Sequence, residues 1–595
     1  MFNHPFALEV AYSAVEESIR LGASYADARY ELSQAEKLTV RDGRLDAVVH
    51  QTERGLGVRV VVRGAWGFAA VSEPTRHDVV VAARRAVDMA RAAAVLLERP
   101  VRFVPASPVR STYRTAIRRD PLAVALEDKI ELLSKVDDGL RRHEGVVDAV
   151  ASVRAQRRRK IYVNSDGAEI DQELVWAGGG CSAGVRGGET APRFAVRGHP
   201  RARAGAFSAS GWEFVQGLRL DEQAERVARE AKALAACQPC PAGRMPVLFT
   251  AQATADLVSA TCGRFLESDR AVGWSHADRF TSSVTGERLG RAQIASPIVN
   301  VFADAMAEGG AGTFGFDDEG IEAHRVELIR EGRLVGYLVG REAAAALGVS
   351  EASGAMRAAS WADFPTVTPT NIGLSAGDGG DLESLVADTR AGLLIEGAQD
   401  ISLDERGELF CGVGEFGWVI ENGRRAYRIA RPAYRGSTAD LWAGCDAIGD
   451  AGSWAWFGVL GRTALGRSRP AECIPQGRGA APARFKALEV GPAAGERRPL
   501  EPREGGASAV TYVERALETD ADLEPSDLEV DQAALLSTAG PKRVSTTKAQ
   551  ATAKQPTAKR AEAKSEPKPK SPKPKPKRKT GQKATRKRSG RKARG

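Results

Sequence analysis

The stretch KLTVRDGRLDAVVHQ, residues 37–51, decides the fold class of this 595-residue chain. Two strand-like runs, Lys37–Arg41 and Leu45–Gln51, flank the pair Asp42-Gly43. An Asp-Gly pair between two such runs favours a tight turn, because both turn residues must adopt a positive φ. The stretch therefore predicts a β-hairpin.

Similar strand-like runs continue on both sides of this hairpin, at residues 28–33 and 55–63. Helical spacing of apolar residues before and after them predicts helices over 7–21 and 78–93. The second helix has one clear apolar face, formed by Val79, Val80, Ala83, Val87 and Ala90. The first 93 residues are thus expected to form a sheet with a helix at each end.

A second unit of sheet and helix is expected between residues 126 and 187. It begins with a helix over 126–141, continues with strands over 146–154, 160–164 and 168–174, and is followed by a helix over 220–236. The loop 237–243 contains two prolines and a glycine, and we place the domain boundary there. Residues 245–491 are β-rich after one early helix, with strands predicted at 246–250, 327–330, 334–338, 392–395, 408–411, 417–420 and 425–429.

The chain is therefore predicted to be an α/β (α+β) protein with an N-terminal domain over residues 1–240 and a C-terminal domain over 245–491. Its composition is typical of a soluble protein, with 43% apolar and 27% charged residues. It has no apolar run of the roughly 18–20 residues that a membrane helix needs. The N-terminus does not resemble a signal peptide, and seven scattered cysteines do not form a disulfide framework. A cytoplasmic location is expected.

The net charge of +9 is the sum of two opposite parts. Residues 541–595 contain 21 Lys and Arg against Glu562 and Glu566, which gives +19 and leaves −10 for residues 1–540. We interpret residues 492–540 as an acidic low-complexity linker. Residues 541–595 are rich in Lys, Pro and Arg and have no apolar periodicity, so they cannot bury enough surface to offset their ordering entropy. They are predicted to be a disordered basic tail.

Several stretches resemble the TldD/PmbA family, which is also called the modulator of DNA gyrase family. They occur in the same order and spacing over most of the first 491 residues: GASYADARY from Gly22, VRDGRL from Val40, RGLGVRV from Arg54, GAWGFA from Gly64, DDEG from Asp317, EGRLVGYL from Glu331 and IENG from Ile420. The resemblance implies a two-domain α/β chain that pairs as a homodimer, or as a heterodimer with a related subunit. It also implies a zinc peptidase that acts on small or unfolded peptides.

The family's zinc site consists of His-Glu-x-x-x-His on a helix early in the second domain, together with a Cys near the C-terminal end. Two imidazoles and a thiolate hold Zn²⁺ with one open position, and the Glu takes a proton from the bound water. In this chain FLESD, residues 265–269, resembles the family's Gly-Leu-Glu-Gly-Asp and places the helix at 253–269. The two His positions then become Ser259 and Arg264, the Glu becomes Ala260, and the Cys becomes Leu460.

No catalytic residue, metal ligand or zinc cofactor is therefore expected at these positions, because Ser, Arg and Leu together do not bind zinc. Arg264 would instead place a permanent positive charge where the metal stood. Cys473 lies too far downstream to replace Leu460 without a rearranged loop.

Other residues with metal-binding or nucleophilic chemistry have simpler interpretations. His143-Glu144 with Asp148 is interpreted as a solvated turn, Cys237-x-x-Cys240 as a linker, and Cys262 as a core residue, although His276 or His324 could lie near it in space. Asp317-Asp318-Glu319 is expected to be structural or to contact peptide. Arg357 lies where the family has arginines that could hold a peptide carboxylate.

The basic tail is predicted to bind DNA or RNA. Its lysines alternate with prolines, which keep the backbone extended along a phosphate track, and it has no aromatic residue or folded element to read bases. A location on the nucleoid would follow from DNA binding; a purely solubilising tail is the alternative. The residues predicted to bind are Lys568, Lys570, Lys573, Lys575, Lys577, Arg578 and Lys579.

Three functions remain open from the sequence. The first is a non-catalytic or partner-dependent subunit that pairs with an intact paralogue in peptide proteolysis. The second is a peptidase that is active through an unconventional site. The third is a nucleic-acid-associated protein that acts through its basic tail. No membrane partner is expected.

Overall fold

The hairpin around Asp42-Gly43 is present, and it is much longer than the sequence indicates. Strands β1 (Tyr25–Arg41) and β2 (Arg44–Val62) pair antiparallel along their whole length, from Arg41 opposite Arg44 at the turn to Tyr25 opposite Val61. Asp42 and Gly43 have φ values of 49° and 78°. Both are positive, as the two-residue turn requires.

This computed structural model describes residues 2–187, 193–200, 205–274, 288–404, 406–461, 474–493 and 510–512. Residues 1–516 form one compact unit, and residues 517–595, which include the predicted basic tail, lie outside the described residues.

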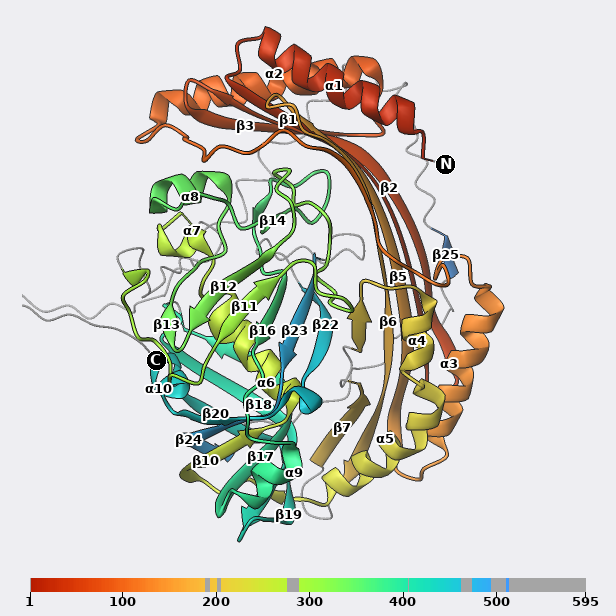
Figure 1. Cartoon of the computed structure of the whole chain (residues 1–595). Helices are drawn as coiled ribbons and strands as arrows, with labels where there is room; N and C mark the ends of the chain where they lie inside the picture. The colour runs from red at the N-terminus through yellow and green to blue at the C-terminus, as the bar shows by residue number, and fades with distance from the viewer. Residues whose placement is uncertain are drawn as a thin grey trace, which may run out of the picture. The chain divides into compact units, whose positions relative to one another are not determined.

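The N-terminal sheet is built on four long antiparallel strands. Strands β5 (Val146–Asn164) and β6 (Glu169–Gly187) continue the sheet in the order β25-β2-β1-β5-β6-β4, and Figure 1 shows these long strands running side by side. Shorter strands complete it: β3 (Ala65–Ser72), β4 (Arg110–Arg114), β7 (Arg193–His199), β8 (Ala206–Ser208) and β25 (Val510–Tyr512).

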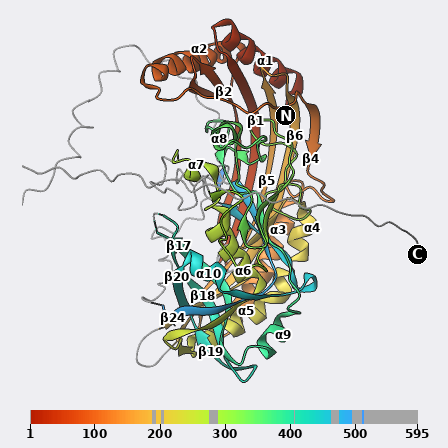
Figure 2. The same cartoon turned by 60° about the vertical axis from the view of Figure 1, so that its left-hand side comes forward.

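One face of this sheet is apolar and is covered by helices. Even-numbered residues of β1 and β2 point to this face. At one end of the strands they pack against α1 (His4–Arg20) and α2 (Arg76–Ala93), and at the other against α3 (Leu126–Arg141) and α5 (Leu220–Ala235). The short α4 (Trp212–Gly217) precedes α5, and a 3₁₀ turn, η1 (Ala94–Leu96), follows α2. Figure 2 shows the two helix groups at opposite ends of the strands.

The opposite face of the same strands contacts the C-terminal part of the chain. Gly55 and Gly57 lie on this face, where a Cβ atom would come within 2.2 Å of the Trp361 ring and 2.4 Å of its carbonyl oxygen, respectively. Successive side chains of a strand alternate between the two faces of a sheet. The β1–β2 hairpin therefore contacts the helices with one face and the C-terminal part with the other.

The C-terminal part, from β9 to β24, contains two main sheets around the largest apolar core. In the eight-stranded sheet β17 also pairs with β18, so five strands close on themselves. Its strands are β9 (Gln238–Pro239), β10 (Gly243–Phe249), β17 (Ala391–Leu403), β18 (Leu409–Glu421), β19 (Arg424–Ala430), β20 (Pro432–Ser437), β21 (Cys445–Ile448) and β24 (Ala483–Pro492).

The second sheet, of six strands, has the order β13-β12-β11-β16-β23-β22. Its strands are β11 (Val301–Asp304), β12 (Arg325–Arg330), β13 (Arg333–Leu334), β16 (Asn371–Leu374), β22 (Ala455–Gly461) and β23 (Ile474–Ala480). A separate pair, β14 (Met356–Arg357) and β15 (Thr366–Val367), lies apart from it. The described helices of this part are short: α6 (Ala251–Val258), α7 (Ser268–Ala271), α8 (Arg341–Leu347), α9 (Leu382–Ala387) and α10 (Thr438–Ala443). The segment η4 (Ala451–Ser453) is a 3₁₀ turn.

Three local predictions are corrected by the structure. The helix expected over 253–269 ends as an α-helix at Val258 and continues as a π-helical turn over Ser259–Gly263. Further along, the Leu266 carbonyl and the Ser268 amide hydrogen-bond to the backbone of Leu338. The loop expected at 237–243 contains strand β9, which pairs with β19. The strand expected over 334–338 extends only over Arg333–Leu334. Among the described helices, none is both long and apolar enough to cross a membrane.

Candidate functional site

The helix predicted to correspond to the zinc helix ends in an unusual turn. After α6, residues Ser259–Gly263 form a π-helical turn, and the Arg264 amide donates to the Ser259 carbonyl at 3.3 Å. Residues five apart lie about 140° from each other around an α-helix, whereas an i to i+5 bond brings them to one side. A His-Glu-x-x-x-His motif needs this geometry, because its two His residues are five apart.

The residues at those positions do not fit a zinc ion. Ser259 is buried, Ala260 is half-buried and Arg264 is exposed. Leu460 lies on β22 opposite Pro475, and α6 packs against this strand. A hydroxyl, a methyl, a guanidinium and an isobutyl group offer no imidazole, thiolate or carboxylate for the metal. Among the residues that the structure describes, no group of three or more His, Cys, Asp or Glu side chains could hold a metal ion.

The turn itself is fixed by contacts with the core. Thr261 donates its hydroxyl to the Leu257 carbonyl at 2.6 Å and accepts a hydrogen bond from the Trp442 indole at 2.9 Å. Cys262 is buried in the same core, and burial raises the pKa of its thiol to about 12. A thiol with this pKa stays protonated at neutral pH and is a poor nucleophile.

A buried ion pair lies one turn before Ser259. Asp256 on α6 accepts from the Arg478 guanidinium of β23 at 2.8 Å, and the Asp256 side chain is only 2% exposed. Asp256, which lies on α6 before Ser259, is therefore paired with Arg478.

The Asp317-Asp318-Glu319 segment joins the C-terminal part to the charged face of the N-terminal sheet. Asp318 accepts from the Lys160 ammonium of β5 at 2.8 Å and from the Ala358 amide at 2.8 Å. Both charged side chains are less than 10% exposed. Lys160 and Arg29 hold the pKa of Asp318 well below its usual range, despite burial that raises it.

Glu319 forms the second connection to the sheet. Arg59 of β2 pairs with Glu319 at 3.3 Å and with Asp27 of β1 at 2.8 Å. The Arg59 guanidinium also lies 4.6 Å from the Trp66 ring centre and 5.2 Å from that of Phe364. Such contacts with aromatic rings compensate a desolvated guanidinium in part.

Arg357 is held inside the protein by backbone carbonyls. Its Nη1 donates to Pro475 at 2.7 Å and to Pro369 at 3.2 Å, and its guanidinium lies 5.2 Å from the Phe314 ring centre. The side chain is buried, which lowers its pKa to about 9. The donors at Nη1 are thus used by the protein itself.

Two further arginines of the sheet bind the segment that follows Arg357. Arg158 of β5 donates to the carbonyls of Ala358 and Ala359, at 3.3 and 2.7 Å. Arg29 of β1 donates to the carbonyls of Ser360 and Asp363, at 3.1 and 2.8 Å. We name the buried charges that connect the two parts the interdomain ion network: Asp27, Arg29, Glu31, Arg59, Arg158, Lys160, Asp317, Asp318, Glu319 and Arg341.

Sequence reasoning did not identify the sheet side of this network. The signal was present, because Asp27, Arg29 and Glu31 alternate along β1, as do Arg158 and Lys160 along β5. Alternating charges usually indicate a solvated face, and here the same pattern marks a buried charged interface.

The other candidates from the sequence have ordinary surroundings. Asp148 pairs with Arg41 at 2.7 Å, and neighbouring Glu144 is exposed. Burial raises the pKa of both Cys237 and Cys240, and each thiol donates to a backbone carbonyl. His324 contacts the Glu322 carbonyl, and His276 and Cys473 lie outside the described residues. The tail residues Lys568 to Lys579 lie outside them as well.

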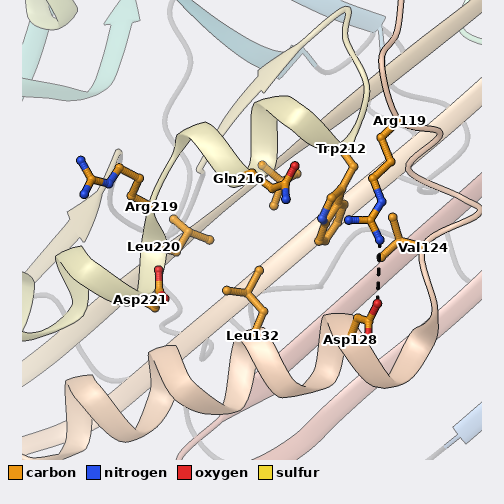
Figure 3. Close-up of a pocket in the computed structure, with 10 residues that line it drawn as sticks. Arg119, Val124, Asp128, Leu132, Trp212, Gln216, Arg219, Leu220 and Asp221 are labelled. Atoms are coloured by element: carbon orange, nitrogen blue, oxygen red, sulfur yellow. Dashed lines mark ion pairs between the residues drawn. The ribbon is translucent and has the colours of Figure 1, made fainter.

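A pocket lies between α3, α4 and α5 (Figure 3). It has a volume of about 280 Å³. Its floor is the Trp212 ring with leucine and valine side chains, and charges of both signs line its rim, where Arg119 faces Asp128 at 3.8 Å. A site with balanced charges and no convergent set of polar groups selects no particular ligand chemistry.

The fold is that of a multidomain α/β chain, and among the described residues no group of His, Cys, Asp and Glu suits a metal ion. Profiles of three PmbA/TldA metallopeptidase domains match the chain: domain 1 over residues 26–94, the central domain over 119–237 and the C-terminal domain over 242–491. The chain belongs to the PmbA/TldD family.

Relatives and solved structures agree with this assignment. A metalloprotease of Methanocaldococcus jannaschii is 24% identical over 73% of this chain and 91% of its own length. A metalloprotease TldD homologue of Haemophilus influenzae is 28% identical over 62% of this chain and 73% of its own.

Two crystal structures have a similar fold. One is a putative modulator of a DNA gyrase from Thermotoga maritima, with a TM-score of 0.63 and 17% identity over 81% of this chain and 99% of that one. The other is TldE from Thermococcus kodakarensis, with a TM-score of 0.59 and 16% identity over 80% of this chain and 99% of that one.

Proposed function

We propose that this chain is a non-catalytic or partner-dependent subunit of a PmbA/TldD-type peptidase assembly, which pairs with an intact paralogue or with a second copy of itself. The observation that carries this proposal is the π-helical turn at Ser259–Gly263. The turn keeps the geometry that a His pair five residues apart needs, while Ser259, Ala260 and Arg264 supply none of the chemistry.

The interdomain ion network supports the same proposal. It keeps Asp317, Asp318 and Glu319 engaged with Arg59, Lys160 and backbone amides, so these carboxylates have protein partners instead of a metal. Arg357 likewise donates from Nη1 to two backbone carbonyls of the protein. Carboxylates and an arginine that are bound within the protein suit a subunit that supports a partner.

The zinc content of the purified chain tests this proposal. We expect no stoichiometric zinc in the wild-type chain by elemental analysis, and no peptide hydrolysis that chelation abolishes. Stoichiometric zinc with chelator-sensitive hydrolysis would instead make the chain a peptidase with an unconventional site, and would overturn the proposal.

A reconstructed site supplies the matched control. The variant S259H/A260E/R264H/L460C should gain one zinc per chain, because it restores two imidazoles and a thiolate at the proposed positions. The variant S259H/R264H/L460C, which keeps Ala260, should bind zinc without gaining hydrolysis, because no carboxylate accepts the proton of the metal-bound water. Zinc binding by neither variant would show that Leu460 or the α6 positions are assigned wrongly.

The charge distribution favours a second candidate function, nucleic-acid binding through the tail. The segment from residue 541 carries +19, whereas residues 1–540 carry −10. Such a tail binds phosphates by releasing counterions, so affinity falls steeply with salt and depends little on sequence.

Binding of the full chain and of a 1–540 truncation to duplex DNA, measured across salt concentrations, tests the second function. We expect the full chain to bind with a steep negative slope of log K against log salt and the truncation to bind at least about tenfold more weakly at low salt. Equal binding by both proteins would exclude the tail as the nucleic-acid site.

A further inference from the structure

Among the described residues, the N-terminal half of β2 has few strand partners on the edge away from β1. Strand β3 pairs with residues 55–62 of β2 and ends with Ser72 opposite Gly55. On that same side, the described partner of the first half of β2 is β25, which pairs with Val48, Val49 and His50 only. An edge of this kind presents free N–H and C=O groups that accept another strand.

The segment that occupies this edge comes from the far end of the chain. Strand β25 (Val510–Tyr512) runs parallel to β2, with Val510 opposite Val48, Thr511 opposite Val49 and Tyr512 opposite His50. It belongs to the C-terminal extension, beyond residue 491, where the family match ends. The run AVTYV at residues 509–513 combines β-branched and aromatic residues, which favour strands.

The apolar part of the β2 edge is short and has a polar residue on each side. Its apolar window is Ala47, Val48 and Val49, with Val48 in the buried core beneath. Charged Asp46 precedes the window, and His50, which faces Glu36 at 3.4 Å, follows it. Polar side chains at both ends limit the length of strand that can dock, as edge strands of native proteins do to avoid aggregation.

We propose that the β2 edge around Ala47–His50 is a strand-docking site of the β-augmentation type, and that its occupant is the chain's own segment Val510–Tyr512. Main-chain hydrogen bonds hold such a strand, and alternate side chains give it specificity. Docking ties the beginning of the C-terminal extension to the N-terminal sheet. This inference does not depend on the proposed peptidase or nucleic-acid functions.

A three-residue strand binds weakly unless it is tethered. The covalent connection supplies an effective concentration of the order of millimolar, which an untethered peptide must match. The same segment added in trans should therefore bind only at about millimolar concentration, and only when the tethered copy has been removed.

Two full-length variants test the docking. T511P removes a backbone N–H and restricts the chain at the middle of β25, whereas T511V keeps the β-branched shape. In hydrogen exchange of the full chain, we expect those amides among residues 47–51 that point toward β25, and not those that point toward β1, to exchange roughly three- to tenfold faster in T511P than in wild type. T511V should behave as wild type, and the amides of residues 56–62, which pair with β3, should not change in either variant.

Peptide binding gives the second readout. A labelled peptide of residues 508–514 should bind full-length T511P with an apparent dissociation constant at least about threefold lower than for wild type or T511V, because the tethered segment no longer competes. Equal amide exchange in the three chains, or equal peptide affinity, would overturn the proposal.

Discussion

At the scale of single residues, the most informative groups are carboxyls whose pKa is raised by burial. Burial raises the pKa of Glu267 to about 7, against attraction from Arg270 and Arg264. Burial and the neighbouring Glu319 raise the pKa of Asp269 to about 6 and that of Asp317 to about 7. Glu267 and Asp269 lie in the FLESD stretch that follows the π-helical turn, so the protonation of carboxyls near this turn changes within the physiological range.

Glu267 gives a pH prediction with a definite sign. Because the pKa of this carboxyl is raised in the folded chain, the folded state holds a proton that the unfolded state releases above pH of about 4.5. The contribution of Glu267 to the free energy of unfolding is therefore lost as pH rises from about 4.5 to about 7, by at most about 3 kcal/mol. We expect E267Q to remove this part of the pH dependence.

Thermal unfolding between pH 5 and pH 8 measures the effect. In the wild type, Arg270 Nε donates to the Glu267 carboxylate at 2.9 Å. The glutamine of E267Q keeps an oxygen that can accept this hydrogen bond, but it carries no charge. Relative to wild type, E267Q should be no more stable at pH 5 and more stable at pH 8. Parallel pH profiles for the two proteins would contradict the raised pKa.

At the scale of elements, the sequence predicted the existence of the N-terminal strands better than their length. Runs 28–33 and 37–41 are one strand, β1, and runs 45–51 and 55–63 are parts of another, β2. The predicted breaks fall on polar residues such as Glu36, which looks like a loop residue in sequence. It is buried under α3, where it pairs with Lys129, a partner 93 residues away that local reasoning cannot supply.

The candidate site shows the same limit. The resemblance of FLESD to the family's stretch placed Ser259 and Arg264 on a helix. It did not indicate the i to i+5 turn, which contacts Ile372 and Trp442, residues far away in the sequence. Helix α3 was predicted with its observed bounds, 126–141, because its apolar spacing alone determines it. Elements fixed by local pattern were predictable, and those fixed by distant partners were not.

The turn between β1 and β2 gives a prediction at this scale. Gly43 has a φ of 78°, and an added Cβ would lie 2.9 Å from Arg141 Nη2. G43A should lower the free energy of unfolding by about 1–2 kcal/mol, from the left-handed backbone and the displaced arginine together. Denaturant unfolding measures this difference.

Gly22 is a matched control for the backbone cost alone. Its φ is 94°, but an added Cβ would meet nothing within 4 Å. G22A should therefore cost about 1 kcal/mol, less than G43A. An equal or larger loss for G22A would show that the contact with Arg141 plays no part at the hairpin turn.

At the scale of the whole compact unit, the two faces of the N-terminal sheet have different roles. The apolar face holds the helices, and the charged face holds the C-terminal part through the interdomain ion network. Buried ion pairs add little net stability when complete, but removal of one partner leaves an uncompensated charge. The network should therefore act more as a constraint on how the two parts fit together than as a source of stability.

The Lys160–Asp318 pair tests this role. D318N should lower the free energy of unfolding by about 3–5 kcal/mol, because Lys160 stays buried without its carboxylate. The pKa of Asp318 is held well below its usual range, so the carboxylate is charged throughout pH 5–8 and the loss should not vary over that window. Denaturant unfolding at both ends of the window measures it.

The double variant K160M/D318N separates the two possible explanations of such a loss. If the cost arises from an unpaired charge, removing Lys160 as well should recover most of the stability that D318N loses, since the pair as a whole contributes little. E131Q, which breaks the exposed Glu131–Lys135 pair on α3, should change stability little and controls for the loss of any ion pair. A double variant as unstable as the sum of both single variants would instead mean that Asp318 acts mainly through its bond to the Ala358 amide, 2.8 Å away, and that the charges do not hold the two parts together.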